Sequence, residues 1–452
     1  GRARKLEEGG YRFDMGPTWY WMPEVFEKFF NRFGHSVKDF YRLSRVDPGY
    51  RMYFSEDDYV DIPADPEQLF DVFENIEKGS GNKLRKFLKK AEFKYNIGIN
   101  KLVYLPGNSY LELLRWDLIS GIVKMDFFKS VSSYVRSQFK DHRLRQVLEF
   151  PVIFLGATPQ NTPALYTLMN YADLSLGTWY PEGGMYSVVD AMKRVGEEQG
   201  VEFRFSAGVD EIMMNGKGST GLRVNGEEFR SDGVVAAADY HHVEQKLLPE
   251  NYRRYSEKYW DKRVMAPSSI LFYLGINKKL ANLEHHNLFF DEDFIQHAEE
   301  IYKNPRWPSK PAIYVSRNTV TDPTVAPGGH DNLIILIPVA PDLEDREDIR
   351  EHYFNLVMER LEKITRQSIR EHVVYKRSYA HRDFKSDYNS YKGNAYGLAN
   401  TLLQTANFKP AMRNPKVHNL FYTGQLTVPG PGVPPTIISG QVVSDQVQKY
   451  LG

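Results

Sequence analysis

The hydrophobic pattern of the first ninety residues predicts a strand, a hairpin and two helical segments. Residues 11–15 alternate apolar and polar side chains, as a half-buried strand does. Apolar residues recur at helical spacing over residues 23–33, which we predict to be a helix, and over residues 65–90, which we predict to be largely helical. Between them, residues 50–62 alternate with the period of a hairpin.

The middle of the chain switches between helix and strand patterns. An amphipathic helix is predicted over residues 185–200, and short strands over 201–205 and 209–214. The run GVVAAA at 233–238 is small and apolar, which predicts a central strand buried on both faces. This succession is typical of part of a nucleotide-binding α/β unit.

The next part of the chain carries strand patterns with little strand–helix alternation. One clear helix is predicted over residues 355–366, and strands are predicted over residues 265–276, 312–316, 333–339 and 373–378. This arrangement predicts a sheet with helices on one face.

The C-terminal stretch FYTGQLTVPGPGVPPTIISG predicts a buried strand, a glycine- and proline-rich loop and a helix over residues 436–450. Pro434 and Pro435 suit a first helical turn, where their missing N–H groups would be unpaired anyway. The positive end of the helix dipole would face the loop and favour diffuse negative charge, such as a phosphate or a reduced flavin. The alternative is a purely structural strand–loop–helix corner.

Composition narrows the possibilities. With 452 residues the chain can form two domains, one perhaps inserted in the other. Lys+Arg and Asp+Glu both number 58, so no net charge points to nucleic acid. The absence of cysteine excludes disulfides, thiolate metal sites and cysteine nucleophiles. No apolar run is long enough to span a membrane.

Known catalytic and metal motifs are missing. The histidine pairs His241-His242 and His285-His286 are adjacent, and adjacent residues do not share a helix face. No HExxH, GxSxG, P-loop or GxGxxG motif occurs, so we expect no metal site. RNA-binding patterns are absent as well.

Residues 83–145 are rich in lysine, arginine, aromatic and aliphatic side chains. Helices with apolar faces edged by lysines are typical of elements that lie at a membrane surface. The alternative is a solvated helical lid whose lysines cover apolar surface with their stems.

Six sequence blocks follow one another along nearly the whole chain. The blocks are GRARKLEEGGYRFDMGPTWYWMP, GTWYPEGGMYSVVDAM, VVAAADYHHVEQKLL, TDPTVAPGGHDNLIILIPVAP, GNAYGLANTLLQTANFKP and LFYTGQLTVPGPGVPPTIISGQ. In this order they resemble the bacterial carotenoid (phytoene-type) desaturases, which are FAD-dependent, amine-oxidase-like flavoproteins. The family places a strand with a GxGxxG motif before the first block, so we expect this chain to be truncated at its N-terminus and the full-length protein to hold FAD.

The resemblance implies a mixed α/β (α+β) fold. A Rossmann-like FAD-binding domain would be interleaved with a sheet-plus-helix substrate domain and a helical, membrane-facing lid. The FAD-binding domain would comprise residues 1–50, 176–262 and 393–452. Residues 51–175 would form the first part of the substrate and lid domain, and residues 263–392 the second.

The resemblance also implies site residues. Arg2 would lie near the cofactor, Gly16, Pro17 and Thr18 near the isoalloxazine, and Val209 would contact adenine through its backbone. Gly424 would approach the ribityl-phosphate region, and Val433, Pro434 and Thr436 the flavin edge. Trp19, Trp21 and residues 102–128 would line a substrate tunnel, unless they are ordinary core. No catalytic base is evident; Asp141 and Arg145 are candidates, and the alternative for Asp141 is a helix N-cap.

The implied reaction is desaturation of phytoene or a related acyclic carotenoid by hydride transfer to flavin. Such an enzyme would be cytoplasmic and peripheral at the inner face of the bacterial cell membrane, because its substrate dissolves in the bilayer. Alternatives are a carotenoid ketolase or isomerase, an amine oxidase of the same fold, and a non-catalytic carotenoid- or lipid-binding protein. The oligomeric state stays open.

Overall fold

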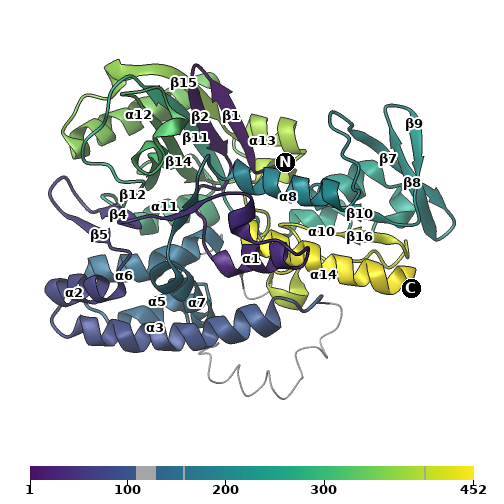
Figure 1. Cartoon of the computed structure of the whole chain (residues 1–452), viewed down its shortest axis with the longest axis horizontal. Helices are drawn as coiled ribbons and strands as arrows, with labels where there is room; N and C mark the ends of the chain where they lie inside the picture. The colour runs from purple at the N-terminus through teal and green to yellow at the C-terminus, as the bar shows by residue number, and fades with distance from the viewer. Residues whose placement is uncertain (108–128, 156–157, 402–403) are drawn as a thin grey trace.

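The computed structural model describes residues 1–107, 129–155, 158–401 and 404–452. Three groups of elements are arranged around a common centre (Figure 1). A large sheet with the long helix α12 occupies one end, and a layer of helices around α3 lies below it. The meander β7–β9 lies at the opposite end from the large sheet. The C-terminal helix α14 runs beneath the short strands β10 and β16.

The large sheet has seven strands in the order β15-β11-β14-β13-β12-β4-β5. Neighbours are antiparallel except for the parallel pair β12 and β4. Its strands span β15 Val373–Tyr379, β11 Ser268–Ile276, β14 Asp331–Val339, β13 Ile313–Ser316, β12 His286–Phe289, β4 Tyr50–Tyr53 and β5 Tyr59–Ile62. The predicted hairpin over 50–62 and the four predicted strands are confirmed, whereas β12 was missed.

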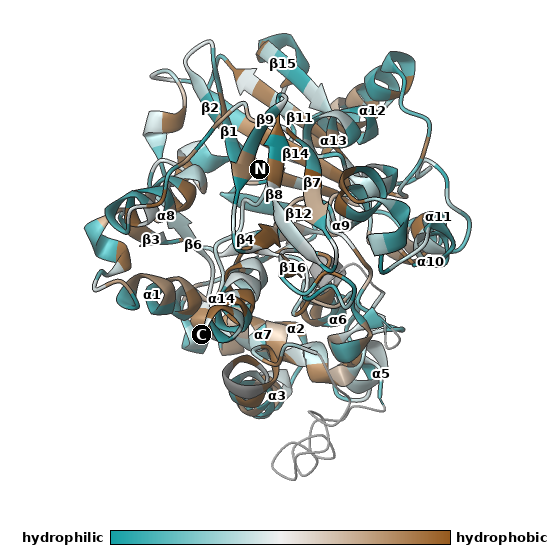
Figure 2. Ribbon diagram, turned by 90° about the vertical axis from the view of Figure 1, so that its right-hand side faces the viewer, coloured by the Kyte–Doolittle hydropathy of each residue, from teal (hydrophilic) through white to brown (hydrophobic). Residues whose placement is uncertain are grey.

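Alternation along β11 explains how the sheet is covered on both faces. Ile270, Phe272 and Leu274 pack with α12 (Glu347–Thr365), while Leu271 and Tyr273 pack with the hairpin of β1 (Arg4–Glu8) and β2 (Tyr11–Met15). All nine residues of β11 are therefore buried. Figure 2 shows the hydrophobic colour concentrated in these inner strands. The strand predicted over 11–15 is confirmed, and α12 begins eight residues earlier than predicted.

The helical layer contains the segment predicted to be largely helical over 65–90, which is confirmed and consists of two helices. Asp65 caps α2 (Pro66–Ile76) through its carboxylate, and α3 (Ser80–Ile97) starts after Gly79. Glu77 adopts an extended conformation and Gly79 a left-handed one (φ 84°), so the helix cannot continue through this turn. The same core takes in α5 (Val131–Arg136), α6 (His142–Glu149) and α7 (Leu168–Tyr171).

A short parallel pair, β10 (Val234–Ala236) and β16 (Leu420–Tyr422), lies beside α8 (Tyr186–Glu198) and α14 (Val433–Leu451). The strands β7 (Val209–Asn215), β8 (Gly218–Val224) and β9 (Glu227–Arg230) form an antiparallel meander. Two predictions were wrong here. Residues 201–205 form no strand, and Val235 is 45% exposed because β10 pairs only with β16 among the described residues.

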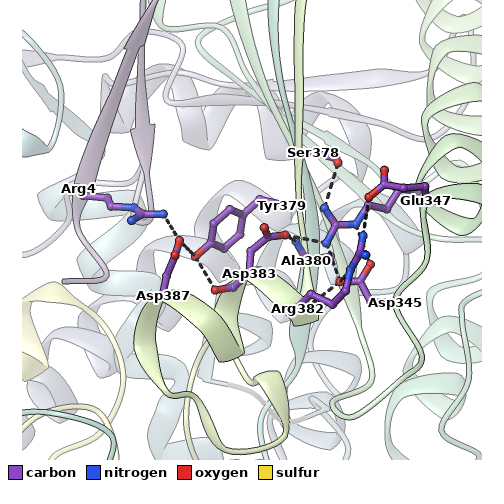
Figure 3. Close-up of polar contacts among 10 residues, drawn as sticks. Arg4, Asp345, Glu347, Ser378, Tyr379, Ala380, Arg382, Asp383 and Asp387 are labelled. Carbon is purple, nitrogen blue, oxygen red and sulfur yellow. Dashed lines mark hydrogen bonds and ion pairs between the residues drawn. The ribbon is translucent and has the colours of Figure 1, made fainter. Parts of the chain in front are cut away.

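Charged side chains tie the β1–β2 hairpin and α12 to helix α13 (His381–Tyr388), as Figure 3 shows. Arg4 on β1 pairs with Asp387, which also accepts a 2.8 Å hydrogen bond from the Tyr379 hydroxyl. Arg350 on α12 donates to Asp345 at 2.6 and 2.7 Å and to Asp383 at 2.7 Å. Each of these charges therefore has a partner of opposite sign.

Candidate functional site

A cavity of about 800 Å³ lies where the large sheet, the helical layer and the start of α14 meet. Most of its wall is apolar and comes from residues 98–105, which follow α3, and from α7, β13 and β14. None of the described residues that line it is charged. Two short segments from opposite ends of the sequence complete the wall. One is residues 16–22, between β2 and α1 (Pro23–Asn31), and the other is residues 428–435.

Five predicted cofactor residues lie on this cavity: Gly16, Pro17, Thr18, Val433 and Pro434. Trp19 and Trp21 line it too. Gly16 has φ 153°, and a Cβ there would lie 2.0 Å from the carbonyl oxygen of Arg2. Glycine is therefore required for the chain to pass over β1 and turn into the cavity wall.

Helix α14 begins at Val433, three residues before the predicted start, so Pro434 and Pro435 do lie in its first turn. The Thr436 N–H already donates to the carbonyl of Gly432 at 3.0 Å. Because both prolines lack an N–H, the backbone N–H of Val433 is the one donor that the first turn of α14 can offer to a ligand. The helix therefore acts on the cavity mainly through its dipole. Thr436 itself is exposed and does not line the cavity.

Three further predicted residues gather around the carboxyl ends of β10 and β16. Arg2 donates to the carbonyl oxygens of Asn394 and Ala395 at 3.0 and 3.3 Å, and its Nη2 lies 3.9 Å from Asp239. Burial lowers the pKa of Arg2, and Nη2 has no hydrogen-bond partner among the described residues. Gly424 directly follows this strand pair, and Val209 packs against its hydrophobic cluster.

Neither predicted catalytic residue lines the cavity. Asp141 is the N-cap of α6 and accepts from the Arg143 backbone at 2.9 Å, so the alternative reading of Asp141 is confirmed. Hydrogen bonds from the Arg143 side chain hold the pKa of Asp141 below its usual value. Arg145 donates to the carbonyl of Phe139 at 2.7 Å. A catalytic role for Asp141 or Arg145 stays a prediction without geometric support.

Two buried polar groups beside Gly430 were not predicted. Asn400 and Lys409 are 3% and 5% exposed, and Asn400 Oδ1 and Lys409 Nζ have no hydrogen-bond partner among the described residues. A Cβ at Gly430 would lie 3.3 Å from Lys409 Nζ and 3.5 Å from Asn400 Oδ1. Burial without a partner lowers the pKa of Lys409 to about 7. Sequence showed only an unusual run of small residues and amides at 393–406.

A hydrogen-bonded chain on the opposite wall was also missed. The Thr18 hydroxyl lies 2.7 Å from the Tyr314 hydroxyl, which lies 2.7 Å from Nδ1 of His286. Trp19 stacks on the His286 ring with centroids 4.0 Å apart and planes 9° apart. Burial lowers the pKa of His286 far below its usual value, so the ring is neutral. No sequence signal connects these residues, because β12 and β13 bring them together.

These residues fit a flavin. A planar ring carrying carbonyl acceptors and an N–H donor could satisfy both Lys409 Nζ and Asn400 Oδ1, which the chain leaves unpaired. The dipole of α14 would favour the negative charge of a reduced flavin. Elsewhere in the described chain, no group of three or more histidine, aspartate or glutamate side chains is placed to hold a metal ion. Nor does any described helix have the length and apolarity needed to cross a membrane.

Comparison with known proteins identifies the family. Residues 1–448 match the family described as flavin containing amine oxidoreductase. The chain is 40% identical over 98% of its length to a carotenoid 3,4-desaturase of Haloarcula japonica, covering 89% of that protein. It is 31% identical over its whole length to a zeta-carotene-forming phytoene desaturase of Myxococcus xanthus, covering 87% of it.

A solved structure agrees with the fold. Cyclohexylamine oxidase from Brevibacterium oxydans superposes with a TM-score of 0.56 at 15% identity, over 100% of this chain and 91% of that one. The mixed α/β fold of an amine-oxidase-like flavoprotein is thereby confirmed, although the membrane-facing role of the lid is not tested. The chain belongs to the flavin-containing amine oxidoreductase family, and it is an oxidoreductase whose cofactor is FAD.

Proposed function

We propose that this protein is an FAD-dependent desaturase that introduces double bonds into phytoene or a related acyclic carotenoid. The observation that carries the proposal is the uncharged, largely apolar cavity, which the flavin-side residues Gly16 to Thr18 and Val433 to Pro434 border. A long hydrocarbon needs such a wall to be held and kept dry. The desaturases named above support the same substrate class.

The cofactor would be held by groups from both ends of the chain. Arg2 and Gly424 would contact its phosphate and ribityl part, and Asn400 and Lys409 its polar ring edge. Val209 would contact the adenine through its backbone. FAD, when bound, supplies the hydride acceptor for the reaction. The protein's own contribution is to orient the polyene against apolar side chains and to exclude water.

The cavity favours this function over amine oxidation. An ammonium substrate would be expected to meet a carboxylate or a polar entrance, and neither Asp nor Glu lines the described cavity. Ketolation or isomerisation of a carotenoid would use the same cavity, and so would a non-catalytic carotenoid-binding protein. Product analysis separates these alternatives.

We also propose that the protein is cytoplasmic and docks peripherally on the inner face of the cell membrane. Lys86, Lys89, Lys90 and Phe93 are exposed on α3. Residues 108–128, which belong to the same predicted basic segment, lie outside the described residues. One residue of the predicted basic surface does not belong to it. Lys94 is 1% exposed and donates to the Ala164 carbonyl at 3.0 Å and to Thr167 at 3.2 Å.

Membrane docking is testable by flotation with anionic vesicles. Lys86→Glu with Lys90→Glu should reduce binding, and added salt should weaken binding by the wild type. The matched control is Lys258→Glu with Lys262→Glu, an exposed pair with the same spacing on another part of the molecule. Equal flotation of both double variants, with no salt dependence, would contradict the docking proposal.

The domain division stays a proposal. We assign residues 1–50, 176–262 and 393–452 to the FAD-binding domain, and residues 51–175 and 263–392 to the substrate domain. The cavity would then lie between the two.

Expression in cells that accumulate phytoene tests the function. The account expects pigments with longer conjugated systems than phytoene in the extract. Oxygenated or isomerised carotenoids would favour the ketolase or isomerase alternative. Bound but unchanged phytoene would favour a carotenoid-binding protein.

A further inference from the structure

The hydrogen-bonded chain Thr18–Tyr314–His286 begins at the cavity and ends inside the protein. Thr18 and Tyr314 both line the cavity, whereas His286 is fully buried behind them on β12. Both hydroxyl-to-partner distances are 2.7 Å, which is short enough for proton transfer along the chain. This wall is therefore a route from an apolar space to a basic nitrogen.

The proposed direction of proton transfer requires one tautomer of His286, whose Nε2 has no hydrogen-bond partner among the described residues. His286 is neutral, so Nδ1 can accept the Tyr314 proton only if the ring proton sits on Nε2. The Tyr314 oxygen can in turn accept from Thr18. The neighbouring His285 ring, 4.4 Å away, is also buried and neutral, and burial lowers its pKa to about 3. No carboxylate bonds to His286 among the described residues, so the free-base imidazole is its resting form.

Desaturation requires a proton acceptor within reach of the substrate. One carbon loses hydride to FAD, and the neighbouring carbon must lose a proton so that its C–H electron pair forms the double bond. No charged residue lines the described cavity, and Asp141 and Arg145 lie outside it. Among the other hydroxyls that line the cavity, those of Tyr166 and Thr405 bond to each other at 2.6 Å.

We propose that Thr18 and Tyr314 take up the proton lost by the polyene and pass it to His286. The proposal rests on the desaturase function proposed above. The substrate C–H proton moves to the Thr18 oxygen as the Thr18 proton moves to the Tyr314 oxygen and the Tyr314 proton moves to His286 Nδ1. Bound FAD would supply the acceptor for the hydride and its electron pair, so charge and atoms would balance. A weak base suffices because a carbon next to a polyene cation is a strong acid.

The test compares Tyr314→Phe and His286→Gln with the control Tyr20→Phe in the FAD-loaded protein. Tyr20 is a fully buried tyrosine that bonds Tyr41 at 3.0 Å and does not line the cavity. We expect kcat to fall about 100-fold or more in both chain variants, with KM within about twofold. The control should stay within about twofold of the wild type in both constants.

Deuterium kinetic isotope effects distinguish a role of these residues in proton transfer from a role in packing alone. With deuterium on the carbon that loses the proton, the isotope effect on turnover should increase in Tyr314→Phe. Deuterium on the hydride-losing carbon should have a smaller effect than in the wild type. A static check is nitrogen NMR of labelled histidine. It should show His286 as the Nε2–H tautomer at neutral pH, with a shift of Nδ1 in Tyr314→Phe.

Several results would overturn the proposal. One is turnover in Tyr314→Phe and His286→Gln equal to that of Tyr20→Phe, and another is an unchanged isotope effect at the proton-losing carbon. If Tyr314→Phe does not fold, Thr18→Val replaces it, with the same expected direction. A wild type that binds FAD but forms no desaturated product would refute the desaturase function itself, which is a different outcome.

Discussion

Two buried cations, Arg350 on α12 and Lys409 beside the cavity, have opposite surroundings. Arg350 is held by two carboxylates, Asp345 and Asp383, at 2.6 to 2.7 Å. Lys409 Nζ is as deeply buried, yet it has no hydrogen-bond partner among the described residues. Burying an unpaired amine costs free energy; the ion pairs of Arg350 avoid this cost in the sheet layer, whereas Lys409, behind the cavity lining, bears it. The cavity wall is therefore built for a ligand, and the sheet layer for stability.

The largest expected loss of stability is at Arg350, the cation that is paired with carboxylates. Asp345→Ala would leave Arg350 with Asp383 alone and should lower the free energy of unfolding by about 3–5 kcal/mol. Urea unfolding of the wild type and the variant measures the difference. A loss below about 1 kcal/mol would show that the pair is not structural.

Acid should weaken the same pair. Burial alone would raise the pKa of Asp345, but hydrogen bonds from Arg350 and Arg382 hold it below its usual value. The stabilisation is therefore complete above the unfolded-state pKa of about 4 and is lost as pH falls through the native pKa. Asp345→Ala should flatten this part of the stability profile. An unchanged acid profile would contradict the assignment.

The next effect lies where the two regions join. Gly16→Ala would place a Cβ against the Arg2 carbonyl and should cost about 2–4 kcal/mol, as backbone strain of this kind does. The control Gly208→Ala has open space around the new Cβ and should change stability by less than about 0.5 kcal/mol. Thermal unfolding of both variants tests the difference, and equal melting temperatures would contradict it.

Lys409→Met should raise stability when FAD is not bound. A lysine whose native pKa is about 7 binds fewer protons folded than unfolded between about pH 7 and 10.4. Wild-type stability should therefore rise with pH across that window, and the variant should lack the rise. At pH 7 or below we expect a gain of about 1–3 kcal/mol from removing the unpaired amine.

Lys94→Met is the matched control for this prediction. Lys94 is equally buried but donates to Ala164 and Thr167, so its removal should cost about 1–3 kcal/mol instead. In addition, Lys409→Met should weaken FAD binding, measured by flavin fluorescence, and Lys94→Met should not. Destabilisation by both substitutions would remove the distinction between paired and unpaired lysines.

The smallest expected effect is at Thr436. Its side chain is exposed on α14 and does not line the cavity, so Thr436→Ala should change stability by less than about 0.5 kcal/mol. FAD affinity should also be unchanged. A clear loss of affinity would return Thr436 to the flavin edge, where the family resemblance placed it.

Sequence patterns predicted the elements whose environment is uniform along their length. Strands β11 and β14 are nearly continuous apolar runs because both faces are covered, whereas β2 alternates apolar and polar residues although its Asp14 is buried too. Strand β12 escaped prediction because HNLF mixes polar and apolar residues that are all buried. His286 Nδ1 bonds to Tyr314, and the Asn287 amide donates to the Val315 carbonyl, and both partners are distant in sequence.

The site divided in the same way. Glycines and prolines at 16–17 and 430–435 indicate tight turns of the backbone. The position of these two segments at the cavity could therefore be predicted. What Asn400, Lys409 and Tyr314 contribute depends on which partners they have or lack in three dimensions. The spacing of these residues along the sequence does not reveal their hydrogen-bond partners.

Pigment extraction from phytoene-accumulating cells that express this protein tests the central claim most directly. The account predicts that phytoene decreases and that carotenoids with longer conjugated systems, absorbing visible light, accumulate in its place. Unchanged phytoene, in cells whose purified protein is folded and carries FAD, would contradict the account.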